Sequence, residues 1–298
     1  MKMRVLAKAK INLTLDVLHK RPDGYHEVEM VMQSLELADC VDLTLREDGK
    51  VTLKVDRGDL PDDGRNLAYR AAALLQRESG TGFGVDIGLY KKIPLAAGLA
   101  GGSADAAAVL WGLNSLWRLD LPIEELERLG AELGSDVPFC LAGGTVLASG
   151  RGERLTALPA MPDCAVVLVK LPVSVSTAWV YGQYGTAKVV CHPDTGGMLA
   201  ALAAHDFSAV AAKVGNVLEN VTVPAWPEIA AVKAELARRG AKAVLMSGSG
   251  PTVFALAEDE ASALELAAGL EELWPAEVIV TKTSKVGCEN GREALIAD

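Results

Sequence analysis

The chain has 298 residues, half of them hydrophobic and 23% charged, so it can bury a large core without a structural metal or disulfides. Asp and Glu outnumber Lys and Arg by 39 to 29, and the net charge of −10 argues against a nucleic-acid partner, which would need a basic face. Five scattered cysteines without a Cys-x-x-Cys pair indicate reduced thiols in a cytoplasmic protein rather than a zinc site. The apolar runs are too short for a membrane span or a signal peptide, and the sequence carries no sign of an oligomeric state.

The first half of the chain is predicted to contain several strands followed by helices. Apolar and polar residues alternate over residues 11–17, which is typical of a strand with one buried face. Asn66 is placed to cap a helix that Gly80 ends. Further strands are predicted at residues 28–35, 41–45, 51–55 and 83–93, with 41–45 and 51–55 joined across Glu47-Asp48-Gly49, and further helices at residues 104–117 and after Pro122.

The second half has a different order of predicted strands and helices. The change of composition around residues 158–162 predicts two domains, 1–158 and 159–298. Strands are predicted at residues 164–170, 242–246, 252–256 and 277–282, and helices at residues 177–184, 197–205, 207–219, 227–239 and 260–274. Strands and helices run in blocks rather than in strict alternation, which favours an α+β fold over a doubly wound sheet.

The strongest local signal is the sequence Pro-Leu-Ala-Ala-Gly-Leu-Ala-Gly-Gly-Ser-Ala-Asp at residues 94–105, the first glycine loop. Its glycines allow the backbone to approach a ligand closely, and the following helix adds unpaired amides and the positive end of its dipole. These features predict a phosphate site, to which Ser103 could add a hydroxyl group. The pattern is neither Walker A nor G-x-G-x-x-G, and a tight turn that packs a helix on a strand is the alternative.

A second glycine loop, residues 246–253, has the sequence Met-Ser-Gly-Ser-Gly-Pro-Thr-Val between two predicted strands. Alone it is more typical of a hairpin turn than of a binding loop. It would matter for function only if the fold brought it beside the first glycine loop.

Few side chains outside these loops have types and positions that suggest chemistry. Lys8, Lys10 and Asn12 share one face of a predicted strand, which could line a cleft or face water. Asp136 precedes Val-Pro, so a helix N-cap is the favoured interpretation and a general base the alternative. Tyr25-His26 after a Pro-Asp-Gly turn could stack on a base or only anchor the loop. No histidine spacing suggests a metal site, and no serine-hydrolase elbow is present.

Taken in order, the motifs resemble those of the GHMP kinases, the superfamily of galactokinase, homoserine kinase, mevalonate kinase and phosphomevalonate kinase, over nearly the whole chain. They are A-K-A-K-I-N-L at residues 7–13, P-D-G-Y-H at 22–26, the first glycine loop, G-S-D-V-P-F at 134–139 and S-G-S-G-P-T at 247–252. The first two resemble the branch of the superfamily that phosphorylates a cytidine-diphosphate-linked polyol for isoprenoid synthesis by the non-mevalonate route.

The resemblance implies a two-lobed α+β fold, with an N-terminal lobe like domain 2 of ribosomal protein S5 and a ferredoxin-like C-terminal lobe. ATP, with Mg²⁺ held mainly by its own oxygens and by water, would meet the cytidyl substrate between the lobes. Asp136 would take the proton of the substrate 2-hydroxyl group, and Lys10 would keep that carboxylate ionised and neutralise developing charge.

The resemblance also implies the binding residues. Asn12 would position the polyol hydroxyls, Tyr25 and His26 would hold the cytosine, and Thr177 and Tyr181 match a second substrate segment. Lys91 would lie near the nucleotide. The ATP phosphates would be bound by Pro94, Leu95, Ala96, Ala97, Gly98, Leu99, Ala100, Gly101, Gly102, Ser103 and Ala104.

Three alternatives remain beside this interpretation. One is another small-alcohol kinase of the superfamily, and a second is diphosphomevalonate decarboxylase, which shares the fold but has no cytosine for the P-D-G-Y-H turn to hold. The third is a nucleotide-binding regulator without catalysis, against which the presence of both Lys10 and Asp136 argues. The family often has Asn-Asp-Leu-Glu where this chain has Asn216-Val-Leu-Glu219, and no role is assigned to that segment.

Overall fold

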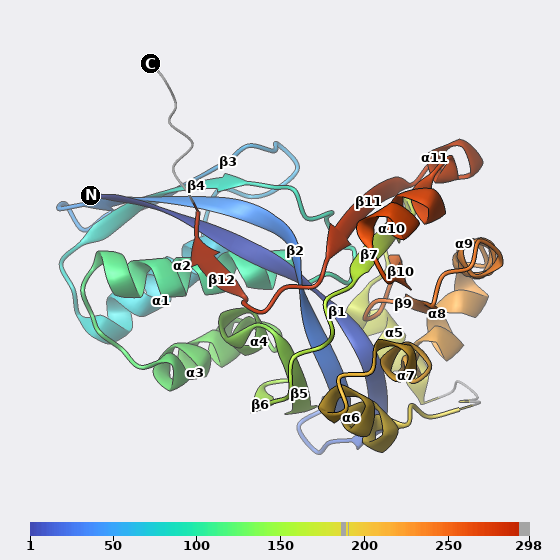
Figure 1. Cartoon of the computed structure of the whole chain (residues 1–298). Coiled ribbons are helices and arrows are strands. Elements are labelled where there is room, and N and C mark those ends of the chain that lie inside the picture. Colours follow the sequence, from blue (N-terminus) through green and yellow to red (C-terminus); the bar gives the residue numbers. More distant parts are fainter. Residues whose placement is uncertain (186–188, 190, 292–298) are drawn as a thin grey trace.

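The computed structural model describes residues 1–185, 189 and 191–291, which form two lobes side by side (Figure 1). Each lobe has its own sheet covered by helices, one sheet of eight strands and one of four. Helices and strands follow one another in blocks, so the predicted α+β class is confirmed. Among the described residues, no helix combines the length and the apolar character needed to cross a membrane.

The first lobe is built on the eight-stranded sheet, whose main path runs β12-β1-β2-β4-β3. β5 extends it by pairing with β2 and β6, and β8 pairs with β1. Helix α2 packs on β1 and β2, and α1 packs on α2. The bounds are β1 (Lys2–Lys20), β2 (His26–Arg46), β3 (Val51–Val55), β4 (Gly84–Tyr90), β5 (Thr145–Gly150), β6 (Arg154–Ala157), β8 (Gly215–Asn216), β12 (Cys288–Asn290), α1 (Leu67–Ser79), α2 (Gly101–Leu116), α3 (Ile123–Leu133) and α4 (Val137–Ala142).

The second lobe has the sheet order β11-β7-β10-β9, in which every pair is antiparallel. Numbered along the chain this order is 4-1-3-2, and with the intervening helices it gives the βαββαβ arrangement of a ferredoxin-like domain. The bounds are β7 (Ala165–Lys170), β9 (Ala243–Met246), β10 (Val253–Ala257), β11 (Glu277–Lys282), α5 (Thr177–Tyr184), α6 (Thr195–Ala203), α7 (Phe207–Ala211), α8 (Glu219–Ala225), α9 (Glu228–Arg238), α10 (Glu260–Ala267) and α11 (Leu270–Leu273).

Several local predictions are confirmed. Asn66 caps α1 by accepting a hydrogen bond from the amide of Ala68, and Gly80 ends the helix in the left-handed conformation. α5 and β11 have the predicted bounds. The division of the chain at residue 158 stays a prediction, and two strands from beyond that point, β8 and β12, complete the first sheet.

Other predictions fail where tertiary pairing decides the structure. The strands at residues 41–45 and 51–55 are not neighbours, because β4 lies between β2 and β3 and pairs in parallel with β3. The helix predicted over 207–219 ends at Ala211, since Gly215 and Asn216 leave it to pair with β1. The helix predicted over 260–274 is interrupted at Gly269, whose φ of 68° is left-handed.

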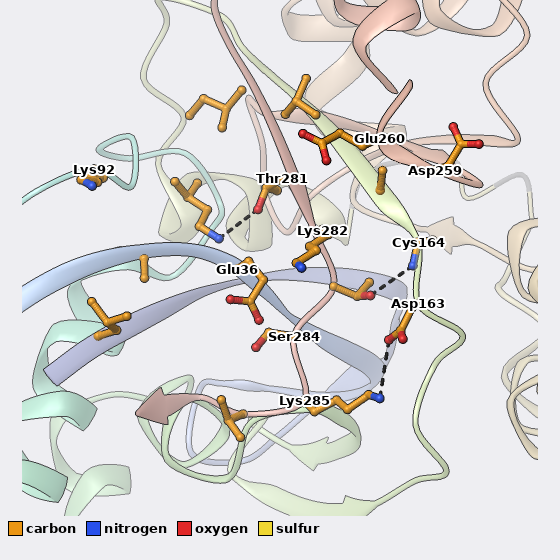
Figure 2. Close-up of a pocket in the computed structure, with 18 of the residues that line it drawn as sticks. Glu36, Lys92, Asp163, Cys164, Asp259, Glu260, Thr281, Lys282, Ser284 and Lys285 are labelled. Atoms are coloured by element: carbon orange, nitrogen blue, oxygen red, sulfur yellow. Dashed lines mark hydrogen bonds and ion pairs between the residues drawn. The ribbon is translucent and has the colours of Figure 1, made fainter. Parts of the chain in front are cut away.

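A cavity of about 960 Å³ lies where the two lobes meet, between β2 and β11 (Figure 2). It is lined by acidic and basic side chains, among them Glu36, Lys282 and Lys285, and by apolar residues of β11. Lys285 pairs with Asp163 at 3.7 Å at one end of it. The lining includes none of the predicted site residues.

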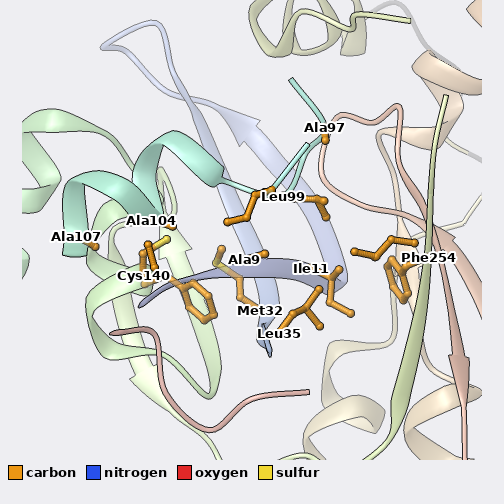
Figure 3. Packing of buried hydrophobic residues seen from close by; sticks show 14 of the residues in the cluster. Ala9, Ile11, Met32, Leu35, Ala97, Leu99, Ala104, Ala107, Cys140 and Phe254 are labelled. Atoms are coloured by element: carbon orange, nitrogen blue, oxygen red, sulfur yellow. The ribbon is translucent and has the colours of Figure 1, made fainter. Parts of the chain in front are cut away.

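The buried core is continuous from one lobe to the other. Figure 3 shows Ala9 and Ile11 of β1 packed with Met32 and Leu35 of β2, and Phe254 of β10 lying next to Ile11. All of these side chains are fully buried. Because close-packed interiors resist deformation, the position of the second lobe relative to β1 is fixed by packing.

Candidate active site

The first glycine loop connects β4 to α2 and folds back against β1. Ala96, Gly98 and Ala100 have φ values of 49°, 73° and 57°, a series of left-handed residues that turns the backbone sharply. The amide of Lys10 donates a hydrogen bond of 3.2 Å to the carbonyl of Leu99, which attaches the loop to β1.

The predicted phosphate-binding residues therefore divide into two groups. The side chains of Pro94, Ala97, Leu99 and Ala104 are buried, so only their backbone could serve a ligand, whereas Leu95, Ala96, Gly98, Ala100, Gly101, Gly102 and Ser103 keep exposed surface. α2 begins at Gly101, and no side chain caps it at Ala100. Since the first amides of a helix have no intrahelical partner, this end can bind an anionic group.

Lys10 and Asp136 meet beside this loop. The Lys10 Nζ lies 3.6 Å from Oδ2 of Asp136 and donates a 2.8 Å hydrogen bond to Oδ1 of Asn12. The side chain of Lys10 is only 5% exposed, whereas that of Asp136 is 31% exposed and open to a ligand. An ammonium group held between a carboxylate and an amide is fixed in position, and it can neutralise negative charge that develops nearby.

Asp136 occupies the N-cap position of α4, but its side chain makes no capping hydrogen bond. The favoured interpretation of the sequence, that this carboxylate caps the helix, is therefore wrong. The side chain instead turns towards Lys10, which comes from a distant part of the chain. Among the described residues, the only hydrogen-bond acceptor of the Asn12 Nδ2 is the sulfur of Met30, at 3.2 Å, which is a weak one.

Aromatic side chains lie at the tip of the β1–β2 hairpin and on α5. The ring of His26 lies 5.4 Å from that of Tyr181, and the guanidinium of Arg151 lies 5.1 Å from the ring centre of Tyr25. Tyr25 is 55% exposed, so its ring face can accept a planar ligand. Thr177 is exposed one helical turn before Tyr181, on the same side of α5.

Burial lowers the pKa of His26 below its ordinary value of 6.5, and the nearby charge of Lys20 adds to this effect. The imidazole is therefore neutral at pH 7, with one nitrogen that donates and one that accepts a hydrogen bond.

The fold also brings the second glycine loop beside the first. Ser247 Oγ donates a 3.0 Å hydrogen bond to the carbonyl of Gly98, and a Cβ on Gly98 would collide with the carbonyl of Ser247. A Cβ on Gly248 would lie 3.6 Å from Oδ1 of Asn12. The loop is thus both the predicted β9–β10 connection and a wall of the site.

Comparison with known proteins gives a consistent assignment. Residues 66–144 match the model of the GHMP kinases N-terminal domain, and residues 198–276 match that of the GHMP kinases C-terminal domain. The 4-diphosphocytidyl-2-C-methyl-D-erythritol kinase of Brevibacillus brevis is 56% identical over 261 residues, 88% of this chain and 89% of that protein. The chain belongs to the 4-diphosphocytidyl-2-C-methyl-D-erythritol kinase family of the GHMP kinases.

Other relatives agree with this membership. The 4-diphosphocytidyl-2-C-methyl-D-erythritol kinase of Bacillus licheniformis is 54% identical over 90% of this chain and 93% of that protein. A crystal structure of 4-(cytidine 5'-diphospho)-2C-methyl-D-erythritol kinase superposes with a TM-score of 0.78 at 35% identity, covering 95% of this chain and all of that one. Homoserine kinase from Cytophaga hutchinsonii, at a TM-score of 0.74 and 21% identity over 97% of each chain, shares the fold.

Membership of this family confirms the predicted GHMP kinase fold and makes the protein a kinase with ATP as co-substrate. The names of the relatives favour the kinase over the decarboxylase and the non-catalytic alternatives. The roles of individual residues stay predictions.

Two lysines of this GHMP kinase have partners that their sequence neighbourhood does not reveal. Strand β1 changes register between Lys8 and Lys10, and Lys8 pairs with Glu36 and Glu289 at 2.6 Å each, away from Asp136. The side chain of Lys8 is 1% exposed. Lys8 therefore joins β1 to β2 and β12. Lys10, and not Lys8, faces Asp136.

Lys91 is likewise buried, in an ion-pair cluster beneath the first glycine loop. Its Nζ contacts Asp39 and lies 2.6 Å from Oδ2 of Asp105, and all three side chains are almost fully buried. Asp39 also accepts hydrogen bonds from the amides of Lys92 and Ile93. The cluster fastens the end of β4 to β2 and α2. Asp105 ends the first glycine loop motif, but no local pattern predicts that it or Asp39 pairs with Lys91.

The cluster has one ammonium for two carboxylates. Burial alone would lower the pKa of Lys91, but Asp105 and Asp39 outweigh it and raise that pKa. Burial, with the charge of Asp39, raises the pKa of Asp105 to about 8 despite the opposing effect of Lys91. The described residues contain no group of three His, Cys, Asp or Glu side chains able to hold a metal ion, and this cluster is occupied by its lysine.

The raised pKa of Asp105 predicts a pH dependence of stability. Below 3.8 both the folded and unfolded carboxyl groups are protonated, and above that value the folded protein keeps a proton that the unfolded chain releases. The free energy of unfolding should therefore fall as the pH rises from about 4 to about 8. Asp105→Asn should remove this part of the slope in urea denaturation curves. Asp62→Asn, at an exposed position, should keep it. An unchanged slope in Asp105→Asn would contradict the assignment.

Proposed function

We propose that the protein transfers the γ-phosphoryl group of ATP to the 2-hydroxyl group of 4-diphosphocytidyl-2-C-methyl-D-erythritol. The observation that carries the proposal is the 3.6 Å pair of Lys10 and Asp136 next to the loop that Leu99 attaches to β1. A carboxylate and an ammonium beside a phosphate-binding loop are the parts that an alcohol phosphotransferase needs.

In the proposed reaction the substrate oxygen attacks the γ-phosphorus while its proton passes to the carboxylate of Asp136. The bond from the γ-phosphorus to the β,γ-bridging oxygen breaks, and ADP leaves with that electron pair. Lys10 stabilises the negative charge on the transferring group, and Asn12, whose amide has only a sulfur partner, orients the polyol hydroxyls. Most of the rate acceleration then comes from positioning and charge neutralisation.

The first glycine loop would bind the ATP phosphates through its backbone. Its exposed residues Ala96 and Gly102, with Ser103, would face the nucleotide, and the buried Pro94, Ala97, Leu99 and Ala104 would hold the backbone in shape. Lys91 would support the loop from beneath the start of α2 rather than bind the nucleotide itself, since its buried Nζ is paired with Asp39 and Asp105 and would lie 3.4 Å from a Cβ on Gly101. In this assignment residues 1–158 form the ATP-binding domain, and residues 159–298 supply the other wall of the cleft.

Mg²⁺ fits this site as an ion carried by the nucleotide. The described residues contain no group of three His, Cys, Asp or Glu side chains for it, whereas the half-buried Ser103 at the start of α2 could offer its hydroxyl beside the first glycine loop. Bound with ATP, Mg²⁺ supplies further neutralisation of phosphate charge. The five free cysteines support the proposed cytoplasmic location, where thiols stay reduced.

The cytidine end of the substrate would bind among the aromatic residues. Tyr25 would stack on the cytosine, and neutral His26 would pair with its polar edge. Tyr181 supports His26 from α5, and Thr177 lies on the same side of that helix.

Removing either member of the charged pair should abolish most of the turnover. Asp136→Asn should lower kcat by about 10²- to 10⁴-fold, because the attacking hydroxyl loses its proton acceptor. Lys10→Met should lower kcat by about 10²-fold or more, because the transferring group loses a fixed positive charge. Coupled measurement of ADP release with the cytidyl substrate gives both values.

The pair of Lys285 and Asp163 is the matched control, since it spans a similar distance at the cavity between the lobes. Asp163→Asn and Lys285→Met should leave kcat within about twofold, as is usual for an exposed ion pair. A folded Asp136→Asn variant with near-normal kcat would contradict the proposed mechanism.

The cytosine contact predicts a different kinetic signature. Tyr25→Ala should raise KM for the cytidyl substrate by about 10- to 100-fold through loss of base stacking, with a much smaller change in KM for ATP. Tyr90→Ala, at a similarly exposed tyrosine of β4, should change neither constant. Equal effects of Tyr25→Ala on both KM values would show that Tyr25 does not bind the cytosine.

A further inference from the structure

The segment 215–222 lies between β1 and the second glycine loop, and it contains residues 216–219, to which no role is assigned from the sequence. Its first two residues form β8, which pairs with Thr14 and Leu15 of β1. Val217 donates its amide to the carbonyl of Leu15, and its side chain is buried in the core. The polar side chain of the neighbouring Asn216 is directed instead at the second glycine loop.

Asn216 uses its whole carboxamide for hydrogen bonds. Its Nδ2 donates to the carbonyls of Met246 and Gly248, both at 2.8 Å, and its Oδ1 accepts from the amide of Leu218 at 2.9 Å. The residue is only 7% exposed. Buried hydrogen bonds of this kind hold their partners in one arrangement, since a lost donor leaves two carbonyls without a partner.

Two further side chains of the segment hold the same loop. Glu219 accepts a 2.8 Å hydrogen bond from the amide of Met246 and is itself paired with Lys233 at 2.5 Å. Thr222 donates to the carbonyl of Ser249 at 3.2 Å. Of the three, Asn216 makes two bonds to the loop and reaches Gly248, where a Cβ would lie 3.6 Å from Oδ1 of Asn12.

The position of this loop determines that of its neighbours. Ser247 is hydrogen-bonded to the carbonyl of Gly98 and lies so close that Gly98 has no room for a side chain. Gly248, with a φ of 56°, lies against both Gly98 and Asn12. A displacement of the second glycine loop would therefore be passed to the first glycine loop and to the residue that supports Lys10.

We propose that Asn216 is a positioning residue of the phosphoryl-transfer site, whose carboxamide holds the second glycine loop against the first glycine loop and Asn12. This inference rests on the proposed function, because the reaction is the readout. Asn216 itself contacts neither of the proposed catalytic side chains, and it acts through Gly248 and Ser247. Misplacement by about 1 Å near reacting atoms can cost about 10²-fold in rate.

Asn216→Asp is the direct test, since it keeps the size and the acceptor of the side chain but turns an oxygen towards the two carbonyls. We expect kcat to fall about 10- to 100-fold at a temperature well below the melting temperature of the variant. KM for the cytidyl substrate should stay within about twofold, because the proposed cytosine-binding residues Tyr25 and His26 lie at the tip of the β1–β2 hairpin, where His26 packs against α5. Asn216→Ala, which removes both donors without adding charge, should behave in the same way.

Asn114→Asp is the matched control. Asn114 is also an asparagine whose carboxamide fixes a loop, donating to the carbonyl and accepting from the amide of Leu121 at 3.0 Å each. It lies near the far end of α2, thirteen residues beyond Gly101 and so about 20 Å away along the helix. Its substitution should lower the melting temperature but leave kcat within about twofold.

Each outcome decides between the alternatives. A wild-type protein that does not phosphorylate the cytidyl substrate would contradict the proposed function, not the role of Asn216 in particular. Wild-type turnover with a folded Asn216→Asp variant of unchanged kcat would contradict the positioning role. The positioning role would also be wrong if Asn114→Asp lost as much kcat, or if both substitutions of Asn216 prevented folding, because Asn216 would then serve the fold as a whole.

Discussion

Lys10 makes the two contacts on which the geometry of the site depends. Its backbone amide holds the carbonyl of Leu99, and its side chain lies between Asn12 and Asp136. One residue of β1 therefore fixes the distance between the first glycine loop and a carboxylate that come from separate parts of the chain. Because β1 and β2 form a long, buried hairpin, this arrangement is built on a rigid element rather than on the loops themselves.

Several buried ion pairs and hydrogen bonds outside the proposed catalytic residues hold that arrangement in place. The ion pairs of Lys91 with Asp39 and Asp105 fasten the start of α2, and those of Lys8 with Glu36 and Glu289 join β1 to β2 and β12. Asn216 performs the corresponding task for the second glycine loop. Such contacts stabilise little in net terms, but breaking one leaves a buried group without a partner, so they favour one arrangement over others.

The sequence predicted most local structure because periodicity and capping act within a few residues. The strand over residues 11–17, the cap at Asn66 and the left-handed end at Gly80 all depend on near neighbours. The alternation was misleading about burial, because Asn12, Thr14 and Asp16 are buried as well and the strand has two buried faces, not one. Pairing between distant strands leaves no such signal in the local sequence. The sequence therefore does not predict that β4 lies between β2 and β3, and it predicts a helix where Gly215 and Asn216 form β8. The same limit explains Asp136. Its local sequence is that of a helix cap, but its side chain makes no capping bond and lies beside Lys10, which is distant in the sequence.

The central claim is that Asp136 and Lys10 act together on a hydroxyl group presented to the first glycine loop. A crystal structure with a non-hydrolysable ATP analogue and 4-diphosphocytidyl-2-C-methyl-D-erythritol tests it most directly. We expect the 2-hydroxyl oxygen within about 2.6–3.2 Å of the Asp136 carboxylate and in line with the γ-phosphorus, which would rest on the loop amides. A polyol bound with that hydroxyl directed away from Asp136, or phosphates bound elsewhere than at the start of α2, would contradict it.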